Sequence, residues 1–392
     1  MNFGAVILRF VLLFTLFVAL VSCQQGPESD SPSIIEPDSN LSSEPTQRPA
    51  TSTPEPPTAT PEPPTATALL PTARPTSEPS DKGQVEKGQI TSEALASNLI
   101  GDPATRDFLI YLPRSYDTSE KRYPVVYALH GYYEGIWSLA GMTQDLDAMV
   151  DSGEAEEMIL VFVDGSNKFG GSMYLSSPTI GDYESYIVRE LVDHIDANYR
   201  TLPDRESRGI SGCSMGGDGA LHLALKYPDV FTVAVPMSGT YIGEPESAWD
   251  IPSWSTPEDL DDFNRLLGGA RVFVAAAAAA ASNPDKPPFY LDMPYEEIDG
   301  EVQIVQEVYE KVNATYPVND VGPYLDQPIR LHGLMIYHGE NDAMAPVEVV
   351  RDFDRMLTEQ GVEHEYLEVR GRHCDLDYAP VLNFMSDHLV FE

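Results

Sequence analysis

Apolar runs alternate with amphipathic stretches along the chain from about residue 88 onward. Residues 125–129 and 158–163 are short, continuous apolar runs, typical of strands that are buried on both faces of a sheet. At Ile187, Leu191 and Ile195 the apolar residues recur at helical spacing. Strands that alternate with helices predict an α/β fold with a mostly parallel sheet and helices on both faces. Further strands are predicted at 207–213, 231–237, 329–337 and 363–369, and further helices at 137–152, 183–199, 218–227, 346–360 and from 378 onward.

Two segments depart from this alternation. Residues 90–100 and 104–112 alternate polar and apolar positions around Gly101-Asp102-Pro103, which predicts an antiparallel hairpin. Residues 239–327 separate two predicted strands by nearly ninety residues, too many for a simple crossover. We interpret this insertion as a cap or lid over the C-terminal edge of the sheet; a peripheral insertion away from any site is the alternative.

The first 23 residues have the composition of an export signal. One basic residue, Arg9, precedes an apolar run at 10–21, and the segment ends in Leu-Val-Ser-Cys. This ending resembles the lipobox of bacterial lipoproteins, which predicts cleavage before Cys23 and lipidation of that residue. An uncleaved membrane anchor is the alternative, and both predict an extracytoplasmic protein held at a membrane.

Residues 24–87 are rich in Pro, Thr, Ser and Glu and contain two copies of Thr-Pro-Glu-Pro-Pro-Thr-Ala at 53–66. Such a composition lacks the apolar residues for a core, and proline holds the chain extended. We therefore predict a disordered linker at 24–87 and one folded domain at 88–392. The formal net charge of −38 arises mainly within that domain and disfavours nucleic acid and anionic lipid as partners. The lipid anchor is then the expected membrane contact.

A candidate nucleophile lies in the stretch Gly-Ile-Ser-Gly-Cys-Ser-Met-Gly-Gly at 209–217. The stretch contains a G-x-S-x-G pattern centred on Ser214, between a predicted strand and an Ala/Leu-rich helix. Small neighbours permit the tight turn that exposes the serine hydroxyl at a helix N-terminus. A chance pentapeptide is the alternative, but the strand-turn-helix context that the motif requires is present.

A nucleophilic serine needs a base and an orienting acid, which follow in the order Ser, Asp or Glu, His in this kind of fold. Asp342 follows the predicted strand 329–337, with Glu340 as its rival, and His373 follows the strand 363–369. The other histidines lie within or beside predicted elements, or in the turn His130-Gly131. For the oxyanion we expect the backbone N–H groups of Met215 and Tyr132 as donors.

Three cysteines are present, and lipid would occupy Cys23. Cys213 precedes the candidate nucleophile and Cys374 follows the candidate base. If Ser214 and His373 hydrogen-bond, these neighbours come within disulfide distance, and an exported protein meets an oxidising environment. We predict a Cys213–Cys374 bridge; two buried free thiols are the alternative.

Taken together, these motifs resemble the esterase D-like family of α/β hydrolases, which includes feruloyl esterases, acetyl xylan esterases and S-formylglutathione hydrolases. The resemblance implies an α/β-hydrolase fold and the triad Ser214, Asp342 and His373. It leaves the insertion at 239–327 unmatched, and the cysteines beside Ser214 and His373 are similar to those of tannase-type feruloyl esterases. The stretches that carry the resemblance are 111–117, 123–131, 164–165, 176–178, 212–217, 227–231, 339–342 and His373.

The expected function is that of a lipid-anchored serine carboxylesterase that cleaves acyl or feruloyl esters on carbohydrates. Five aromatic side chains are candidates for contacts to a sugar or phenolic ring; they are Tyr132, Tyr133, Tyr174, Trp249 and Trp254. No metal-ligand cluster or phosphate-binding glycine loop is present in the sequence, so no cofactor is expected. A serine peptidase, or a surface protein that binds a glycan or a partner on a hydrolase fold, are the alternatives.

Overall fold

The computed structural model describes residues 82–392 except 245, 250–253 and 267. The predictions for residues 1–81, including the lipidation of Cys23, concern a part of the chain outside the described residues. Within the described part, no helix combines the length and the hydropathy needed to cross a bilayer.

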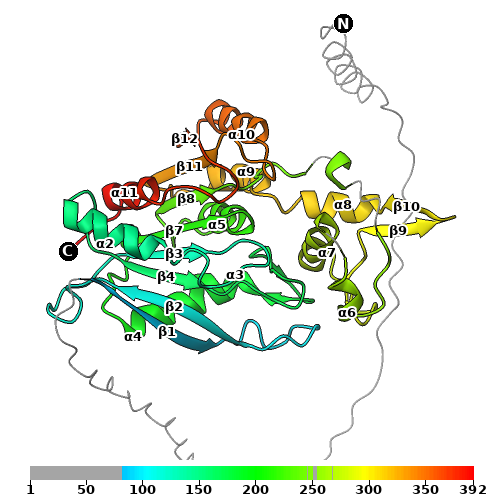
Figure 1. Ribbon diagram of the computed structural model, residues 1–392, viewed down its shortest axis with the longest axis horizontal. Coiled ribbons are helices and arrows are strands. Elements are labelled where there is room, and N and C mark those ends of the chain that lie inside the picture. The colour runs from blue at the N-terminus through cyan, green and yellow to red at the C-terminus, as the bar shows by residue number, and fades with distance from the viewer. Residues whose placement is uncertain (1–81, 245, 250–253, 267) are drawn as a thin grey trace, which may run out of the picture. The chain divides into compact units, whose positions relative to one another are not determined.

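An eight-stranded sheet forms the centre of the domain, in the order β1-β2-β4-β3-β7-β8-β11-β12 (Figure 1). β1 and β2 run antiparallel at one edge, and the strands from β4 to β12 run parallel to one another. The predicted mostly parallel sheet is therefore confirmed. The strands are β1 (Gln84–Thr91), β2 (Thr105–Leu112), β3 (Val125–Leu129), β4 (Ile159–Val163), β7 (Arg208–Cys213), β8 (Val233–Met237), β11 (Gly333–Gly339) and β12 (Glu365–Val369).

Helices cover both faces of the sheet because the central strands are apolar on both sides. Every residue of β3, β4 and β8 is buried. Alternate residues of these strands pack into two separate clusters, one on each face. One cluster includes α2 (Met142–Ser152) and α11 (Ala379–His388). The other includes α3 (Tyr183–Ser185), the π-helical turn η1 (Tyr186–Leu191), α4 (Val192–Asn198), α5 (Met215–Lys226) and α10 (Val347–Gln360).

The predicted hairpin exists, but its first strand was placed wrongly. β1 pairs antiparallel with β2 through Gln84 to Thr91, whereas residues 92–100 form turns. The folded domain therefore begins no later than Gln84, four residues inside the predicted linker. β1 is an edge strand with largely exposed or half-exposed side chains, so its polar sequence looks like linker.

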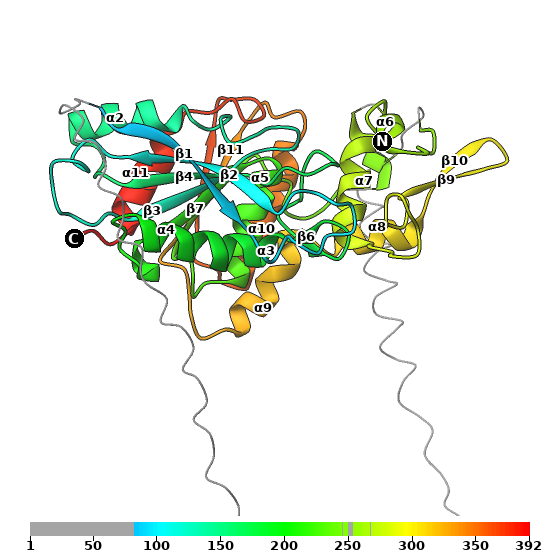
Figure 2. The same cartoon turned by 90° about the horizontal axis from the view of Figure 1, so that it is seen from below.

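Most of the insertion forms a small group of helices and one strand pair beyond one end of the sheet, whereas its last helix, α9, lies against the main domain and contacts α5 (Figures 1 and 2). The alanines at 275–279 are buried within α7, and this helix packs against α8. Ser177 and Thr179 of the main domain tie the group to it, because their hydroxyls donate to Ala278 O and to Tyr290 O. A small antiparallel pair, β5 (Ser176–Ser177) and β6 (Gly181–Asp182), carries this contact. The insertion contains η3 (Glu246–Trp249), α6 (Leu260–Phe263), α7 (Gly269–Ala280), β9 (Tyr295–Ile298), β10 (Glu301–Ile304), α8 (Gln306–Asn313), η4 (Pro317–Asp320) and α9 (Val321–Asp326).

Candidate active site

Ser214 lies at the sharp corner between β7 and α5. Its backbone has φ 58° and ψ −122°, a conformation that side-chain-bearing residues rarely adopt. The corner is held from below, because the Ser214 N–H donates to Met237 O at 3.0 Å. The backbone segments around this corner pack too closely for larger side chains. A Cβ atom on Gly212 would lie 2.3 Å from Gly216 O, and one on Gly216 would lie 2.0 Å from Leu129 O. The glycines therefore permit close backbone approach, and the serine side chain faces the cavity described below.

We predict that Gly216→Ala destabilises the protein because its Cβ meets a backbone carbonyl that cannot rotate away. The free energy of unfolding should fall by at least about 2 kcal/mol in urea titrations. Gly135→Ala is the matched control, since a Cβ atom on Gly135 would meet no other atom within 4 Å, and it should change stability by less than about 0.5 kcal/mol. Equal stability of the two variants would contradict the close-approach argument.

His373 and Asp342, the candidate base and its candidate orienting acid, are hydrogen-bonded to each other. The His373 Nδ1 atom lies 2.8 Å from Oδ2 and 3.0 Å from Oδ1 of Asp342. The Asp342 carboxylate also accepts the backbone N–H groups of Met344 (2.9 Å) and Ala345 (2.8 Å). Burial alone would raise the pKa of Asp342, but the hydrogen bonds from His373 and from these backbone groups lower it below its usual value. Asp342 therefore stays ionised and directs the ring so that Nε2 faces away from the carboxylate.

The contacts of Glu340 and His130, the alternatives to Asp342 and His373, differ from those of the His373–Asp342 pair. Glu340 is exposed and its carboxylate accepts from the side chain of Asn341 rather than from His373. His130 is buried, and both of its ring nitrogens bond backbone groups, Gly131 O and Gly165 N–H. Within the described part of the chain no hydrogen bond joins Ser214 to His373; such bonds often tighten only when substrate is bound.

Asp342→Asn should lower kcat by up to about 10⁴-fold, because an amide in place of the carboxylate favours the wrong tautomer and orientation of His373. Glu340→Gln, two residues away on the same loop, should leave kcat within about two-fold, because this side chain does not reach the histidine. Steady-state kinetics on one ester would measure kcat of both variants. A larger loss of kcat in Glu340→Gln than in Asp342→Asn would assign the orienting acid to Glu340 instead.

The loop after β3, residues 130–134, is called the oxyanion loop below. Hydrogen bonds fix it so that the backbone N–H of Tyr132 remains available. Gly131 N–H donates to Glu134 Oε2 (2.9 Å), Gly131 O accepts from His130 Nδ1 (2.8 Å), and Tyr133 N–H donates to Gly170 O (3.0 Å). A trans peptide directs its N–H away from its C=O, so the bond to Gly131 O turns the Tyr132 N–H the other way. Met215 is the first residue of α5, and its N–H has no acceptor within the helix. Both predicted oxyanion donors thus border the Ser214 cavity.

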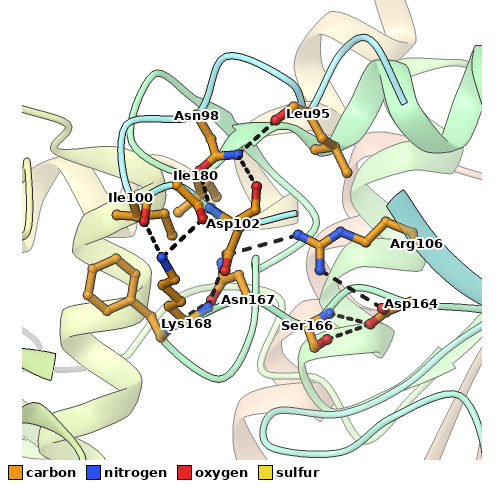
Figure 3. A network of polar contacts seen from close by, with 12 residues as sticks. Leu95, Asn98, Ile100, Asp102, Arg106, Asp164, Ser166, Asn167, Lys168 and Ile180 are labelled. Carbon is orange, nitrogen blue, oxygen red and sulfur yellow. Dashed lines mark hydrogen bonds and ion pairs between the residues drawn. The ribbon is translucent and has the colours of Figure 1, made fainter. Parts of the chain in front are cut away.

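Tyr174 supports this loop and does not contact substrate, which corrects the prediction. It is fully buried, and its hydroxyl donates to His130 O at 2.9 Å. Behind the loop, Asp164 lies 3.8 Å from His130 Nε2 and accepts from Ser166. Figure 3 shows this region, in which buried Arg106 lies between Asp164 and Asp102, each 3.9 Å away. Arg106, Asp102 and Asp164 therefore form a charged network that reaches the oxyanion loop through His130.

The predicted disulfide between Cys213 and Cys374 is present, with Cα atoms 5.9 Å apart. It joins the residue before Ser214 to the residue after His373. The Cys374 N–H also donates to the hydroxyl of Ser238, at the end of β8 (3.3 Å). The bridge therefore ties the loop of the base directly to the strand that carries the nucleophile.

Replacing both cysteines by alanine should lower the free energy of unfolding by about 2–5 kcal/mol and should also lower kcat, because the His373 loop loses its covalent link to β7. Dithiothreitol should reproduce both effects in the wild type and should leave the double variant unchanged. Wild-type kcat that is insensitive to complete reduction, with both thiols then alkylated, would show that the link does not position the site.

Ser214 and His373 border one cavity of about 330 Å³. The insertion contributes to its wall, so the predicted position of this segment at the site is confirmed. Among the described lining residues none is Lys or Arg. The described lining residues are Gly131, Tyr132, Glu134, Met173, Ser214, Met215, Asp218, Ser238, Thr240, Glu244, Val272, Tyr316, Met344, Ala345, His373 and Cys374.

Three carboxyl groups that no sequence motif indicated give the cavity an acidic character; they are Glu134, Asp218 and Glu244. Burial raises the pKa of Asp218 to about 6, although the Tyr241 N–H donates to its Oδ1 at 2.9 Å. Burial and the neighbouring charge of Asp218 raise the pKa of Glu244 to about 7. Asp218 is on α5, one turn after Ser214, and Glu244 lies near the start of the insertion. Anionic substrate groups are therefore disfavoured in this cavity, most strongly above pH 7.

Of the other aromatic candidates for substrate contact, Tyr133 and Trp254 are not among the residues that line the cavity. Tyr133 is 48% exposed on the surface beside the oxyanion loop, where Arg271 lies 4.3 Å above its ring. Trp254 is buried against Tyr295, with ring centroids 4.7 Å apart, so it offers no face to a substrate. The Trp249 side chain is outside the described residues. Of these aromatic residues, Tyr132 lines the cavity.

The chain has the α/β-hydrolase fold, with Ser214, His373 and Asp342 gathered at one edge of its sheet. Residues 101–271 match the family described as "Putative esterase". An esterase of Mycobacterium tuberculosis is 34% identical over 274 residues, which cover 67% of this chain and 51% of that protein. The chain thus spans about half the length of this curated relative.

Other similar proteins carry related names. An endo-1,4-beta-xylanase/feruloyl esterase of Xylanibacter ruminicola is 29% identical over 171 residues, covering 41% of this chain and 23% of that protein. Two solved structures share the fold with TM-scores of 0.53. A ferulic acid esterase is 21% identical, covering 79% of this chain and 99% of its own. A fluorophosphonate-binding serine hydrolase of Staphylococcus aureus is 17% identical, covering 78% and 99%.

Proposed function

We propose that this chain is a serine carboxylesterase that hydrolyses acyl or feruloyl esters carried by carbohydrates. The observation that carries the proposal is the arrangement of one cavity: Ser214 on its strained corner, the His373–Asp342 pair, and two backbone donors at Tyr132 and Met215.

The chemistry proceeds through an acyl-enzyme. The Nδ1–H of His373 is directed to Asp342, so Nε2 carries the lone pair that accepts the Ser214 proton as Oγ attacks the ester carbonyl. The negative charge that develops on the carbonyl oxygen is stabilised by the N–H groups of Tyr132 and Met215. His373 then returns the proton to the leaving alcohol. Water, deprotonated by the same nitrogen, releases the acid and restores the serine.

Two observations support an uncharged, carbohydrate-borne ester. The cavity contains the carboxyl groups of Glu134, Asp218 and Glu244 and, among the described lining residues, no basic side chain other than His373. Carboxylates accept hydrogen bonds from hydroxyl groups and repel anions. The relative from Xylanibacter ruminicola is named for feruloyl esterase and xylanase activities, which is consistent with this substrate class.

The full chain should release product from neutral acetyl, butyryl and feruloyl esters, and Ser214→Ala should reduce turnover by about 10⁴-fold or more, because the attacking oxygen is lost. An ester whose acyl group ends in a free carboxylate should be hydrolysed more slowly than its neutral methyl ester. Equal activity of the wild type and Ser214→Ala would contradict the proposal. Absence of activity in both would favour glycan binding instead.

We further propose that the protein acts outside the cytoplasm, held at a membrane by lipid on Cys23. The lipobox-like sequence Leu-Val-Ser-Cys and the proline-rich segment that follows support this address. In a bacterial host fed radiolabelled palmitate, the wild type should incorporate label, and Cys23→Ala should not. Equal labelling of the two proteins would contradict lipidation at this residue.

A further inference from the structure

A second, smaller cavity of about 50 Å³ adjoins the catalytic one. The two share four lining residues, Met173, Met215, Asp218 and Tyr316. The insertion contributes half of the small cavity, which we name the acyl recess. Its lining residues are Met173, Leu175, Met215, Asp218, His222, Ala276, Val312, Thr315, Tyr316 and Pro317.

The recess lies on the acyl side of the reacting carbon. Met215, whose N–H faces the carbonyl oxygen, lines both cavities, whereas His373, Cys374, Met344 and Ala345 line the catalytic cavity alone. His373 must protonate the leaving oxygen, so the alcohol departs on its side. That side is open, since Met344 is 68% exposed. The acyl chain extends from the other bond of the same carbon, toward the recess.

The recess is mainly apolar, and its ionisable members Asp218 and His222 are engaged with neighbouring groups, although His222 Nε2 only approaches Glu184 Oε1 at 3.4 Å. Met173, Leu175, Ala276 and Val312 present carbon and sulfur atoms, and thioethers adapt to small changes of shape. Asp218 Oδ1 accepts from Tyr241 N–H (2.9 Å), and His222 Nδ1 pairs with Asp320 at 2.7 Å. The recess therefore favours hydrocarbon over a group that needs new hydrogen bonds.

The volume limits what can enter. One water-sized probe occupies roughly 10–15 Å³, so about 50 Å³ holds only a few heavy atoms. An acetyl methyl or a short alkyl chain fits this space, and a substituted aromatic ring does not.

We propose that the acyl recess receives the acyl chain of the substrate and selects short aliphatic acyl groups, acetyl to butyryl, over longer or aromatic ones. This inference rests on the proposed esterase function and narrows it. The insertion then acts as a specificity element, because Ala276 of α7 and Val312 of α8 set the depth of the recess.

The test measures kcat/KM of the full chain on p-nitrophenyl acetate, butyrate and hexanoate. Val312→Ala enlarges the recess and should raise the hexanoate-to-acetate ratio by about ten-fold, because the two carbons removed from the side chain leave room for about two methylenes of the acyl chain. Ala276→Leu fills the recess and should lower the butyrate-to-acetate ratio by about ten-fold. Val272→Ala is the matched control, one turn earlier on α7, because Val272 lines the catalytic cavity but not the recess.

The control should leave both ratios within about two-fold of the wild type. Thermal unfolding identifies a variant that has lost its fold, and Ala276→Val replaces Ala276→Leu if the larger side chain is not accommodated. Ratios that move equally in Val272→Ala, or that do not move in Val312→Ala and the filled variant, overturn the inference while leaving the esterase proposal standing. A wild type that cleaves none of these esters, and none of the acetyl and feruloyl esters above, overturns both.

Discussion

The backbone of Ser214 is the constraint on which the site depends. A residue with a side chain is held at positive φ between the last residue of β7 and the first of α5, and it remains there because the surrounding backbone leaves no alternative. Met237 O binds its N–H from the neighbouring strand, while the glycines at 212 and 216 let β3 and α5 approach closely. The same corner that exposes the hydroxyl also places the free N–H of Met215 beside it.

The other candidate catalytic groups reach this corner from distant parts of the chain. Asp342 follows β11 and His373 follows β12, and parallel pairing brings the C-terminal ends of β7, β8, β11 and β12 to one edge. The disulfide between Cys213 and Cys374 adds a covalent link across 161 residues of sequence. The oxyanion loop is fixed in a different way, by buried His130 and Tyr174 and by half-buried Asp164. Parallel strand pairing and the disulfide therefore fix where Ser214 and His373 lie. The polar contacts of His130 fix the loop that carries the Tyr132 N–H.

Much of this arrangement is predictable from the sequence because it follows from strand ends and motif spacing. Continuous apolar runs identify β3, β4 and β8, and the polar residues directly after β11 and β12 identify Asp342 and His373. β1 was missed in part because an edge strand need not be apolar. Tyr174 and Trp254 were misjudged because an aromatic residue in a sequence gives no sign of whether it is buried. Glu244, Val272 and Tyr316 had no local signal, since only the fold of the insertion brings them to the cavity.

The central claim is that Ser214 is a nucleophile activated by His373, and covalent labelling tests it without reference to any natural substrate. The full chain is treated with a fluorophosphonate and the adduct is located by peptide mass spectrometry. We predict one phosphonate on Ser214, formed at least about a hundred-fold faster than in His373→Ala, because removal of the base leaves a neutral hydroxyl. Labelling of another residue, or equal rates in the wild type and His373→Ala, would contradict the account.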